Sequence, residues 1–163
     1  MIDLYTWHTP NGRKVSIMLE EIGMDYNVHS INIAKDEQFQ PHFLKVSPNN
    51  RIPAIVDKDN NNYSLFESGA ILMYLAEKSG KLLNKTNSDE YYRTIEWLMW
   101  QMGGVGPMFG QVHHFVKYNK GKSAYAEERY SKEARRLYGV MDKRLGQHQF
   151  ISGNEYSIAD ISI

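Results

Sequence analysis

The sequence contains no cysteine among its 163 residues. This absence excludes disulfide frameworks, thiolate metal sites, cysteine nucleophiles and redox pairs of cysteines within the chain. The length is nevertheless sufficient to bury a hydrophobic core of ordinary size. Any thiol chemistry at this protein therefore needs a sulfur atom that another molecule supplies.

Long hydrophobic runs and an excess of one charge sign are also missing. The longest unbroken apolar run, residues 70–76, is far shorter than the roughly 20 residues of a membrane-spanning helix. The first residues lack the basic stretch and apolar run of a secretory signal. Lys and Arg number 19, as do Asp and Glu, so the basic surplus of a nucleic-acid binder is absent. We expect a soluble cytoplasmic protein with neither membrane nor nucleic acid as partner.

Strand and helix signals alternate in the first half of the chain. Strands are expected at residues 2–5, 26–33, 52–57 and 63–66, and helical patterns cover residues 15–22, 38–46 and 68–79. The Ile52-Pro53 bond stands between a loop and a strand, where an Xaa-Pro bond can be cis. The pattern predicts a thioredoxin-like α/β domain over residues 1–80, with Pro53 cis at its ligand-binding edge.

The second half carries helical patterns only. After a linker over residues 80–88, a long helix is marked from Tyr91 to Val116, and a second helix is marked over residues 134–145. The glycines and Pro107 in residues 103–107 are expected to bend or break the first of these helices. The fold class is therefore an α/β domain followed by an all-α domain over residues 88–163.

The last residues predict the start of a further helix. Ser157 is placed as an N-cap, and Asp160 is placed three residues later as its capping-box partner. A helix of about one turn does not recover its nucleation cost. We therefore expect the helical domain to be incomplete and the natural chain to continue beyond Ile163.

Polar residues precede two of the predicted helices. Ser68 follows Glu67 at the start of one helix, where its hydroxyl and the first backbone amides can hold a carboxylate. Thr9 and Asn11 precede the first helix, where a hydroxyl and an amide donor would favour a thiolate over a thiol. Each of these residues can instead be a simple helix cap, and the pattern alone leaves both interpretations open.

Several motifs together resemble the cytosolic glutathione transferases, and more narrowly the bacterial nu-class glutathione-dependent disulfide-bond reductases. The resemblance covers nearly the whole chain. Its motifs are Thr9-Pro10-Asn11-Gly12, Ser47-Pro48-Asn49-Asn50-Arg51-Ile52-Pro53-Ala54, Leu65-Phe66-Glu67-Ser68-Gly69-Ala70-Ile71, Trp100-Gln101-Met102-Gly103-Gly104-Val105-Gly106-Pro107-Met108 and Tyr156-Ser157-Ile158-Ala159-Asp160. The Glu-Ser pair and the Ile-Pro step occur throughout this superfamily, whereas the first and fourth motifs are specific to this branch.

The resemblance implies a glutathione site with assigned residues. Glu67 and Ser68 would hold the γ-glutamyl end, and the Ile52 backbone would pair with the cysteinyl unit. Arg51 and Gln38 would reach the glycyl end and its surroundings. Thr9 and Asn11 would face the sulfur. Family members usually carry Lys where Arg51 stands. The contact would therefore be made by a planar guanidinium, which can form two parallel hydrogen bonds, and not by a lysine ammonium. An arginine on a helix of the second domain, Arg129, matches one that the family turns toward the active site.

The implied function is reduction of disulfides by the glutathione thiolate in a homodimer. Glutathione would be a co-substrate, and the partner would be a disulfide or an electrophilic small molecule. Two alternatives are conjugation of glutathione to electrophiles and a regulatory or interaction module without activity. No metal site is expected, because the adjacent His113 and His114 point about 100° apart on a helix. Tyr5 lies inside a strand pattern and is expected to pack in the core.

Overall fold

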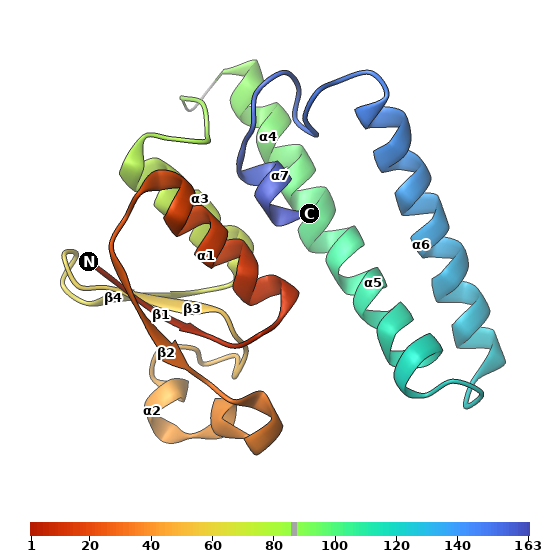
Figure 1. Cartoon of the computed structure of the whole chain (residues 1–163), viewed down its shortest axis with the longest axis horizontal. Helices are drawn as coiled ribbons and strands as arrows, with labels where there is room; N and C mark the ends of the chain where they lie inside the picture. The colour runs from red at the N-terminus through yellow and green to blue at the C-terminus, as the bar shows by residue number, and fades with distance from the viewer. Residues whose placement is uncertain (86–87) are drawn as a thin grey trace. The chain divides into compact units, whose positions relative to one another are not determined.

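The computed structural model describes residues 1–85 and 88–163, and the chain forms two compact units (Figure 1). The first unit comprises residues 1–83 and Ser162, and the second comprises residues 84–161 and Ile163. The division falls inside the predicted linker over residues 80–88. Residues 86 and 87 of that linker lie outside the described part of the chain. Each unit is described by itself below.

The first unit is built on a four-stranded mixed sheet. Its strands are β1 (Ile2–Thr6), β2 (Tyr26–Ser30), β3 (Ala54–Asp57) and β4 (Tyr63–Phe66), in the order β2-β1-β3-β4. β2 runs parallel to β1, whereas β3 pairs antiparallel with both β1 and β4. This topology and the cis Ile52-Pro53 bond confirm the predicted thioredoxin-like fold.

Helices cover both faces of this sheet. α1 (Pro10–Ile22) and α3 (Ser68–Ser79) lie together on one face, and α2 (Pro41–Leu44) lies on the other (Figure 1). Successive strand residues point to opposite faces, so each face has its own core. The core under α1 and α3 is formed by Ile2, Leu4, Val15, Met18, Leu19, Ile55, Ile71, Leu72 and Leu75. The core under α2 is formed by Ile31, Phe43 and Ala54, with Tyr5, Val46, Ile52 and Phe66 packed against it.

The segment after β2 differs from the prediction. The predicted strand over residues 26–33 ends at Ser30, and Ile33–Lys35 forms a short 3₁₀ helix. The predicted helix over residues 38–46 is divided into a 3₁₀ turn, Glu37–Phe39, and α2. Of its apolar residues only Phe43 is fully buried, whereas Phe39 is 51% exposed. Pro41 explains the division, because it lacks the N–H that would continue a helix through this point.

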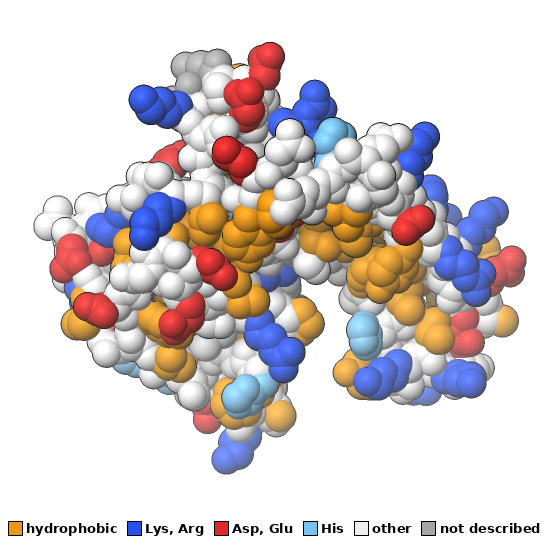
Figure 2. Space-filling model, turned by 45° about the horizontal axis from the view of Figure 1, so that its top comes forward, with side chains coloured by type: hydrophobic (Ala, Val, Ile, Leu, Met, Phe, Trp, Pro, Cys, Tyr) orange, Lys and Arg blue, Asp and Glu red, His pale blue; other side chains and the backbone are white. Residues whose placement is uncertain are grey.

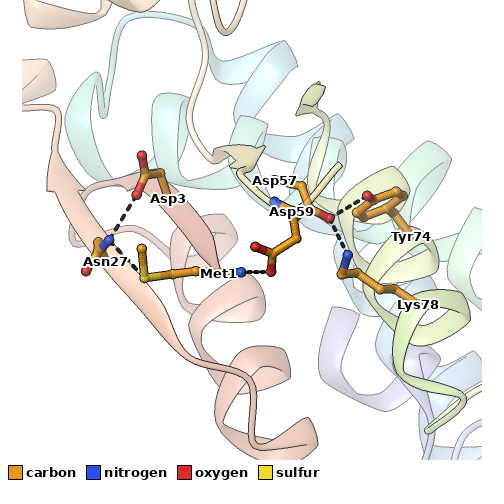
Figure 3. A network of polar contacts seen from close by, with 7 residues as sticks. All are labelled: Met1, Asp3, Asn27, Asp57, Asp59, Tyr74 and Lys78. Atoms are coloured by element: carbon orange, nitrogen blue, oxygen red, sulfur yellow. Dashed lines mark hydrogen bonds and ion pairs between the residues drawn. The ribbon is translucent and has the colours of Figure 1, made fainter. Parts of the chain in front are cut away.

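A polar network ties the strand ends to α3 (Figure 3). Asp57, fully buried at the end of β3, accepts a hydrogen bond of 2.6 Å from the Tyr74 hydroxyl and pairs with Lys78 Nζ at 2.8 Å. Asp3 on β1 accepts from Asn27 at 3.1 Å and pairs with Lys58 at 2.9 Å. Burial raises the pKa of Asp3, but hydrogen bonds from Lys58, Asn27 and His29 outweigh burial and lower it to about 2.

The second unit is helical throughout its regular structure. α4 (Asp89–Trp100) continues through a π-helical turn (Gln101–Val105) into α5 (Gly106–Val112) and a second π-helical turn (His113–Tyr118). The predicted bend or break at residues 103–107 is therefore a local widening of a continuous helix, because Pro107 falls near the start of α5. α6 (Ala124–Leu145) runs beside α5.

The second unit ends in α7 (Ile158–Ser162), which begins with the predicted capping box. Ser157 Oγ accepts from Ala159 N at 3.3 Å, and Asp160 accepts from the backbone N of Ser157 at 3.0 Å and of Ile151 at 2.7 Å. Among the described residues, no helix is both long and apolar enough to cross a bilayer. Basic and acidic side chains both occur across the face drawn in Figure 2, in keeping with the zero net charge.

Candidate functional site

The strand register brings three loops of the first unit to one edge of the sheet. Tyr5 near the end of β1 pairs with Ala54 at the start of β3, and Ala54 pairs with Phe66 at the end of β4. The segments before α1, before β3 and before α3 therefore meet at this edge. They carry most of the predicted site residues: Thr9, Asn11, Arg51, Ile52, Glu67 and Ser68.

The start of α1 is built by Thr9 and Gly12. Thr9 is the N-cap, and its Oγ1 accepts a hydrogen bond of 3.2 Å from the Gly12 backbone N. A Cβ at Gly12 would lie 2.3 Å from Thr6 Oγ1, so glycine lets the helix approach the end of β1 this closely. Asn11 is the second helical residue, with an exposed side chain. Thr9 is therefore a helix cap, whereas Asn11 is not.

The loop before β3 is fixed by a buried serine. Ser47 is fully buried, and its hydroxyl donates a hydrogen bond of 2.8 Å to the Arg51 carbonyl. This bond holds the backbone immediately before the cis Ile52-Pro53 bond. The Arg51 side chain is exposed, and Ile52 is half-buried. The predicted strand over residues 52–57 begins only at Ala54, so the Ile52 backbone lies outside the regular β3 pairing.

The start of α3 has an unusual backbone. Glu67 is its N-cap with φ 72° and ψ 116°, a conformation that residues with a Cβ rarely adopt. Its Oε1 accepts a hydrogen bond of 3.4 Å from Asn49 Nδ2. Ser68 is the first residue of the helix and is 4% exposed. The interpretation of Ser68 as an N-cap is therefore wrong, because Glu67 occupies that position and makes no side-chain capping bond.

Gln38 lies in the 3₁₀ turn after β2. It is 7% exposed, and its Nε2 donates to Asp36 Oδ1 at 3.4 Å. Its Oε1 is buried and has no hydrogen-bond partner among the described residues. A buried amide oxygen without a donor indicates that hydrogen bonding at this turn is incomplete in the protein alone.

Arg129 lies in the second unit, on α6. Its side chain is exposed and lines a cavity of about 660 Å³ together with Met108, Tyr125 and the charged residues Lys132 and Arg136. Arg136 forms a two-point hydrogen-bonded pair with Glu133, at 2.8 Å for each contact. Glu128 and Glu133 line the same cavity, so acidic and basic side chains both occur on this helix face.

One buried cation stands close to the site in sequence. Lys14 on α1 is 6% exposed, and burial lowers the pKa of its ammonium from 10.5 to about 8. No sequence signal marked it, because an isolated lysine in a helix normally extends to solvent. Ser47 and Asn49 were also missed as individual residues, although both stand in the motif around Pro53.

Two further residues take structural roles. Tyr5 stacks on His29 with ring centres 4.7 Å apart and packs against Phe43, as its strand position predicted. His113 Nδ1 lies 3.2 Å from the Phe109 carbonyl, within its own helix. Over residues 1–85 and 88–163, no three His, Asp or Glu side chains are grouped to hold a metal ion.

The order of the mixed sheet and the helices on its two faces define a thioredoxin-fold protein. Residues 1–77 match the family model of the glutathione S-transferase N-terminal domain. The chain belongs to the glutathione transferase family, as its motifs indicated.

Curated relatives extend this assignment beyond the first unit. The chain is 50% identical to the disulfide-bond oxidoreductase YfcG of Escherichia coli, over 99% of the chain and 77% of that protein. It is 43% identical to the disulfide-bond oxidoreductase YghU of the same organism, over 99% of the chain and 58% of that protein. The chain thus spans less of YghU than of YfcG.

Solved structures share the fold throughout the chain. A glutathione transferase family member from Pseudomonas fluorescens, with two glutathione molecules bound, has a TM-score of 0.94 and 54% identity, covering 99% of this chain and 73% of that chain. A glutathione transferase from Pseudomonas putida, with one glutathione disulfide per subunit, has a TM-score of 0.91 and 49% identity, covering 99% and 72% respectively.

Proposed function

We propose that the protein is a glutathione-dependent disulfide oxidoreductase whose reactive sulfur comes from glutathione. The observation that carries the proposal is a thioredoxin-like site edge in a chain without cysteine. A disulfide reductase with no thiol of its own needs a thiol co-substrate. The class of that co-substrate is supported by relatives that are named disulfide-bond oxidoreductases or hold glutathione or its disulfide.

Residues 1–80 are the glutathione-binding domain in this proposal. Glu67 and Ser68 hold the γ-glutamyl end at the start of α3, where the first backbone N–H groups favour a carboxylate. The Ile52 backbone pairs with the cysteinyl unit, and Arg51 and Gln38 hold the glycyl end. The strained backbone at Glu67 supports this role, because such strain is concentrated at ligand-binding sites.

Thr9 and Asn11 face the sulfur. A free thiol with a pKa of about 8.5 is only a few per cent thiolate at pH 7. The lone pair of Thr9 Oγ1 is engaged by the Gly12 N–H, which leaves the hydroxyl hydrogen available to donate to sulfur. That donor, the Asn11 amide and the positive end of α1 together stabilise the thiolate.

The reaction is two successive thiol–disulfide exchanges. The first glutathione thiolate attacks one sulfur of the substrate disulfide, the S–S bond breaks, and its electron pair leaves with the other sulfur as a thiolate. A second glutathione thiolate then attacks the glutathione sulfur of the mixed disulfide. The products are two substrate thiols, after protonation, and one glutathione disulfide.

In this proposal the helical domain over residues 88–163 contributes to binding of the second substrate, and Arg129 on α6 is the residue that the family resemblance assigns to the active site. The protein acts as a cytoplasmic homodimer with one active site per subunit. Light scattering coupled to size-exclusion chromatography tests the dimer, and a monomeric mass with full activity would exclude it.

The function is tested by measuring two activities with glutathione side by side. We expect reduction of hydroxyethyl disulfide to exceed conjugation of an aryl halide. Dominant conjugation would indicate a classical transferase, and glutathione binding without either activity would indicate an interaction module. Pretreating the apo protein with iodoacetamide, followed by removal of the reagent, should leave activity intact, because the chain has no cysteine to alkylate.

The role of Thr9 and Asn11 is tested with the double variant Thr9→Val and Asn11→Ala. We expect turnover to fall more than glutathione affinity, because the two donors act where negative charge resides on sulfur. Thr9→Ser keeps both the cap and the hydroxyl donor, so it is the matched control and should retain activity. Wild-type turnover in the double variant would refute the assignment of these two residues.

A further inference from the structure

A small groove lies between the start of α1 and β2, which is an edge strand of the sheet. Its volume is about 140 Å³, and it is lined by the end of β1, the first turns of α1 and the second half of β2. This volume is several times the roughly 30 Å³ that one water molecule takes up in the liquid. The groove has room for a carboxylate and the methylene groups next to it. None of the residues assigned above to glutathione lines it.

The sheet register explains the polar floor of the groove. Thr6 pairs with Ser30 in the parallel β1–β2 ladder, two residues after Leu4 pairs with Val28. Because strand residues alternate between faces, Thr6 and Ser30 lie on the same face as Leu4, which is the face that α1 covers. Gly12, which also lines the groove, packs so closely on Thr6 that a Cβ there would lie 2.3 Å from Thr6 Oγ1. Two hydroxyl groups therefore line the groove where α1 begins.

The charge of the groove is of one sign. Arg13 and His8 line it, and no Asp or Glu does. The exposed Arg13 guanidinium has no ion-pair partner in the part of the chain that the structure describes. Ser16, also in the lining, donates its hydroxyl hydrogen to the Arg13 carbonyl at 3.0 Å. The Thr6 hydroxyl also donates within the protein, to the Trp7 carbonyl at 3.4 Å. The donors left to an occupant are the Ser30 hydroxyl, the His8 imidazole and the Arg13 guanidinium, and donors without a carboxylate favour an oxyanion.

The groove adjoins the residues that face sulfur in the proposed function. His8, in the lining, is followed directly by Thr9, so their Cα atoms are about 3.8 Å apart. A disulfide that reacts at Thr9 and Asn11 has a second half that must leave as a thiol. That leaving half can extend over His8 toward Arg13.

We propose that this groove is a specificity subsite for a carboxylate on the leaving half of the disulfide substrate, with Arg13 and His8 as its recognition residues. The inference rests on the proposed function and gives it a substrate class. The class is disulfides in which a carboxylate lies two or three bonds from the carbon that carries the sulfur. Both a small acid disulfide and an acidic residue beside a protein disulfide supply this chemistry.

The test uses three disulfides that share one S–CH₂–CH₂ frame and differ in terminal charge: 3,3′-dithiodipropionate, hydroxyethyl disulfide and cystamine. We expect kcat/KM of the wild-type protein to be highest for the anionic dithiodipropionate, lower for the neutral hydroxyethyl disulfide and lowest for the cationic cystamine. Arg13→Gln should lower kcat/KM for dithiodipropionate by about 3- to 10-fold, mainly through KM, and leave hydroxyethyl disulfide unchanged. His8→Asn should act in the same direction.

Arg135→Gln is the matched control, because it removes the same charge from an exposed position on α6. It should leave the ratio of the two kcat/KM values unchanged. A ratio that Arg13→Gln does not alter, or that both variants alter equally, would overturn the subsite, since the second result would show a general effect of net charge. If the wild-type protein did not reduce hydroxyethyl disulfide with glutathione, this result would instead refute the proposed function itself. A protein disulfide with and without a neighbouring Asp then distinguishes the two sources of the carboxylate.

Discussion

The buried ammonium of Lys14 gives a prediction about stability. Lys14 is 6% exposed on the core side of α1, and it shares that side with Met18 and Val15. Burial lowers its pKa from 10.5 to about 8, and Lys14 forms no ion pair within residues 1–85 and 88–163. Lys14→Met keeps an unbranched side chain of similar length and removes the charge. We expect the variant to be more stable than the wild type at neutral pH.

The magnitude follows from proton linkage. A pKa difference of this size corresponds to about 3 kcal/mol at pH 7, because one pKa unit is worth about 1.4 kcal/mol. Between pH 8 and 10.5 the folded Lys14 binds fewer protons than the unfolded one, so this destabilisation fades as pH rises. The advantage of the Met variant should therefore fall from about 3 kcal/mol at pH 7 to below about 1 kcal/mol at pH 10.

The assay is urea unfolding followed by tryptophan fluorescence at pH 7, 8, 9 and 10. Differences between variant and wild type cancel the titration of all other groups. Lys35→Met, at an exposed position, is the matched control and should show no pH-dependent difference. A Met variant that is less stable at every pH, or an advantage that stays constant to pH 10, would refute the reasoning.

Two further predictions concern packing at glycines and the charge of Asp3. Gly12→Ala should destabilise the protein by about 1–3 kcal/mol, because the new Cβ would lie 2.3 Å from Thr6 Oγ1, whereas Gly139→Ala in α6, with nothing within 4 Å, should stabilise by about 0.5–1 kcal/mol. Equal changes in the free energy of unfolding for the two variants, measured with urea, would show that the structure around Gly12 accommodates a Cβ without cost. Asp3→Asn should cost about 2 kcal/mol at pH 7, because the pKa of Asp3 is lowered from 3.8 to about 2. That stabilisation is present above pH 4 and is lost as pH falls toward 2, so stability profiles of variant and wild type should converge there; parallel profiles would contradict the assignment.

Much of the first unit could be predicted from local sequence. Alternating apolar residues predict strands, and 3.6-residue periodicity predicts α1 and α3, because burial of one face dominates the choice of element. Capping signals also worked where the cap is local: Thr9 at α1 and Ser157 at α7 both accept from the backbone of their own helix. The family motifs supplied the residues proposed for glutathione.

Local pattern was insufficient where tertiary contacts set the environment. Ser68 has the residue type of a cap, but the chain path places Glu67 at that position in a strained conformation that only the surrounding loops can hold. Phe39 has the apolar character of a core residue, but the division at Pro41 turns it to solvent. The glycines and Pro107 predict a disturbed helix at residues 101–107, but they do not tell a break from the widened, continuous turn that is found.

Three properties of this protein follow from its amino-acid sequence alone: the order of elements, the absence of any thiol in the chain and the identity of the residues at the helix starts. These properties are local or compositional, so neighbouring residues suffice to establish them. The alignment of Tyr5, Ala54 and Phe66, which brings three loops together, depends on how the strands pair in three dimensions. The tertiary structure also determines that Lys14 is buried and that Arg13 and Ser30 line one groove, because strand register and helix docking join residues that the sequence keeps apart.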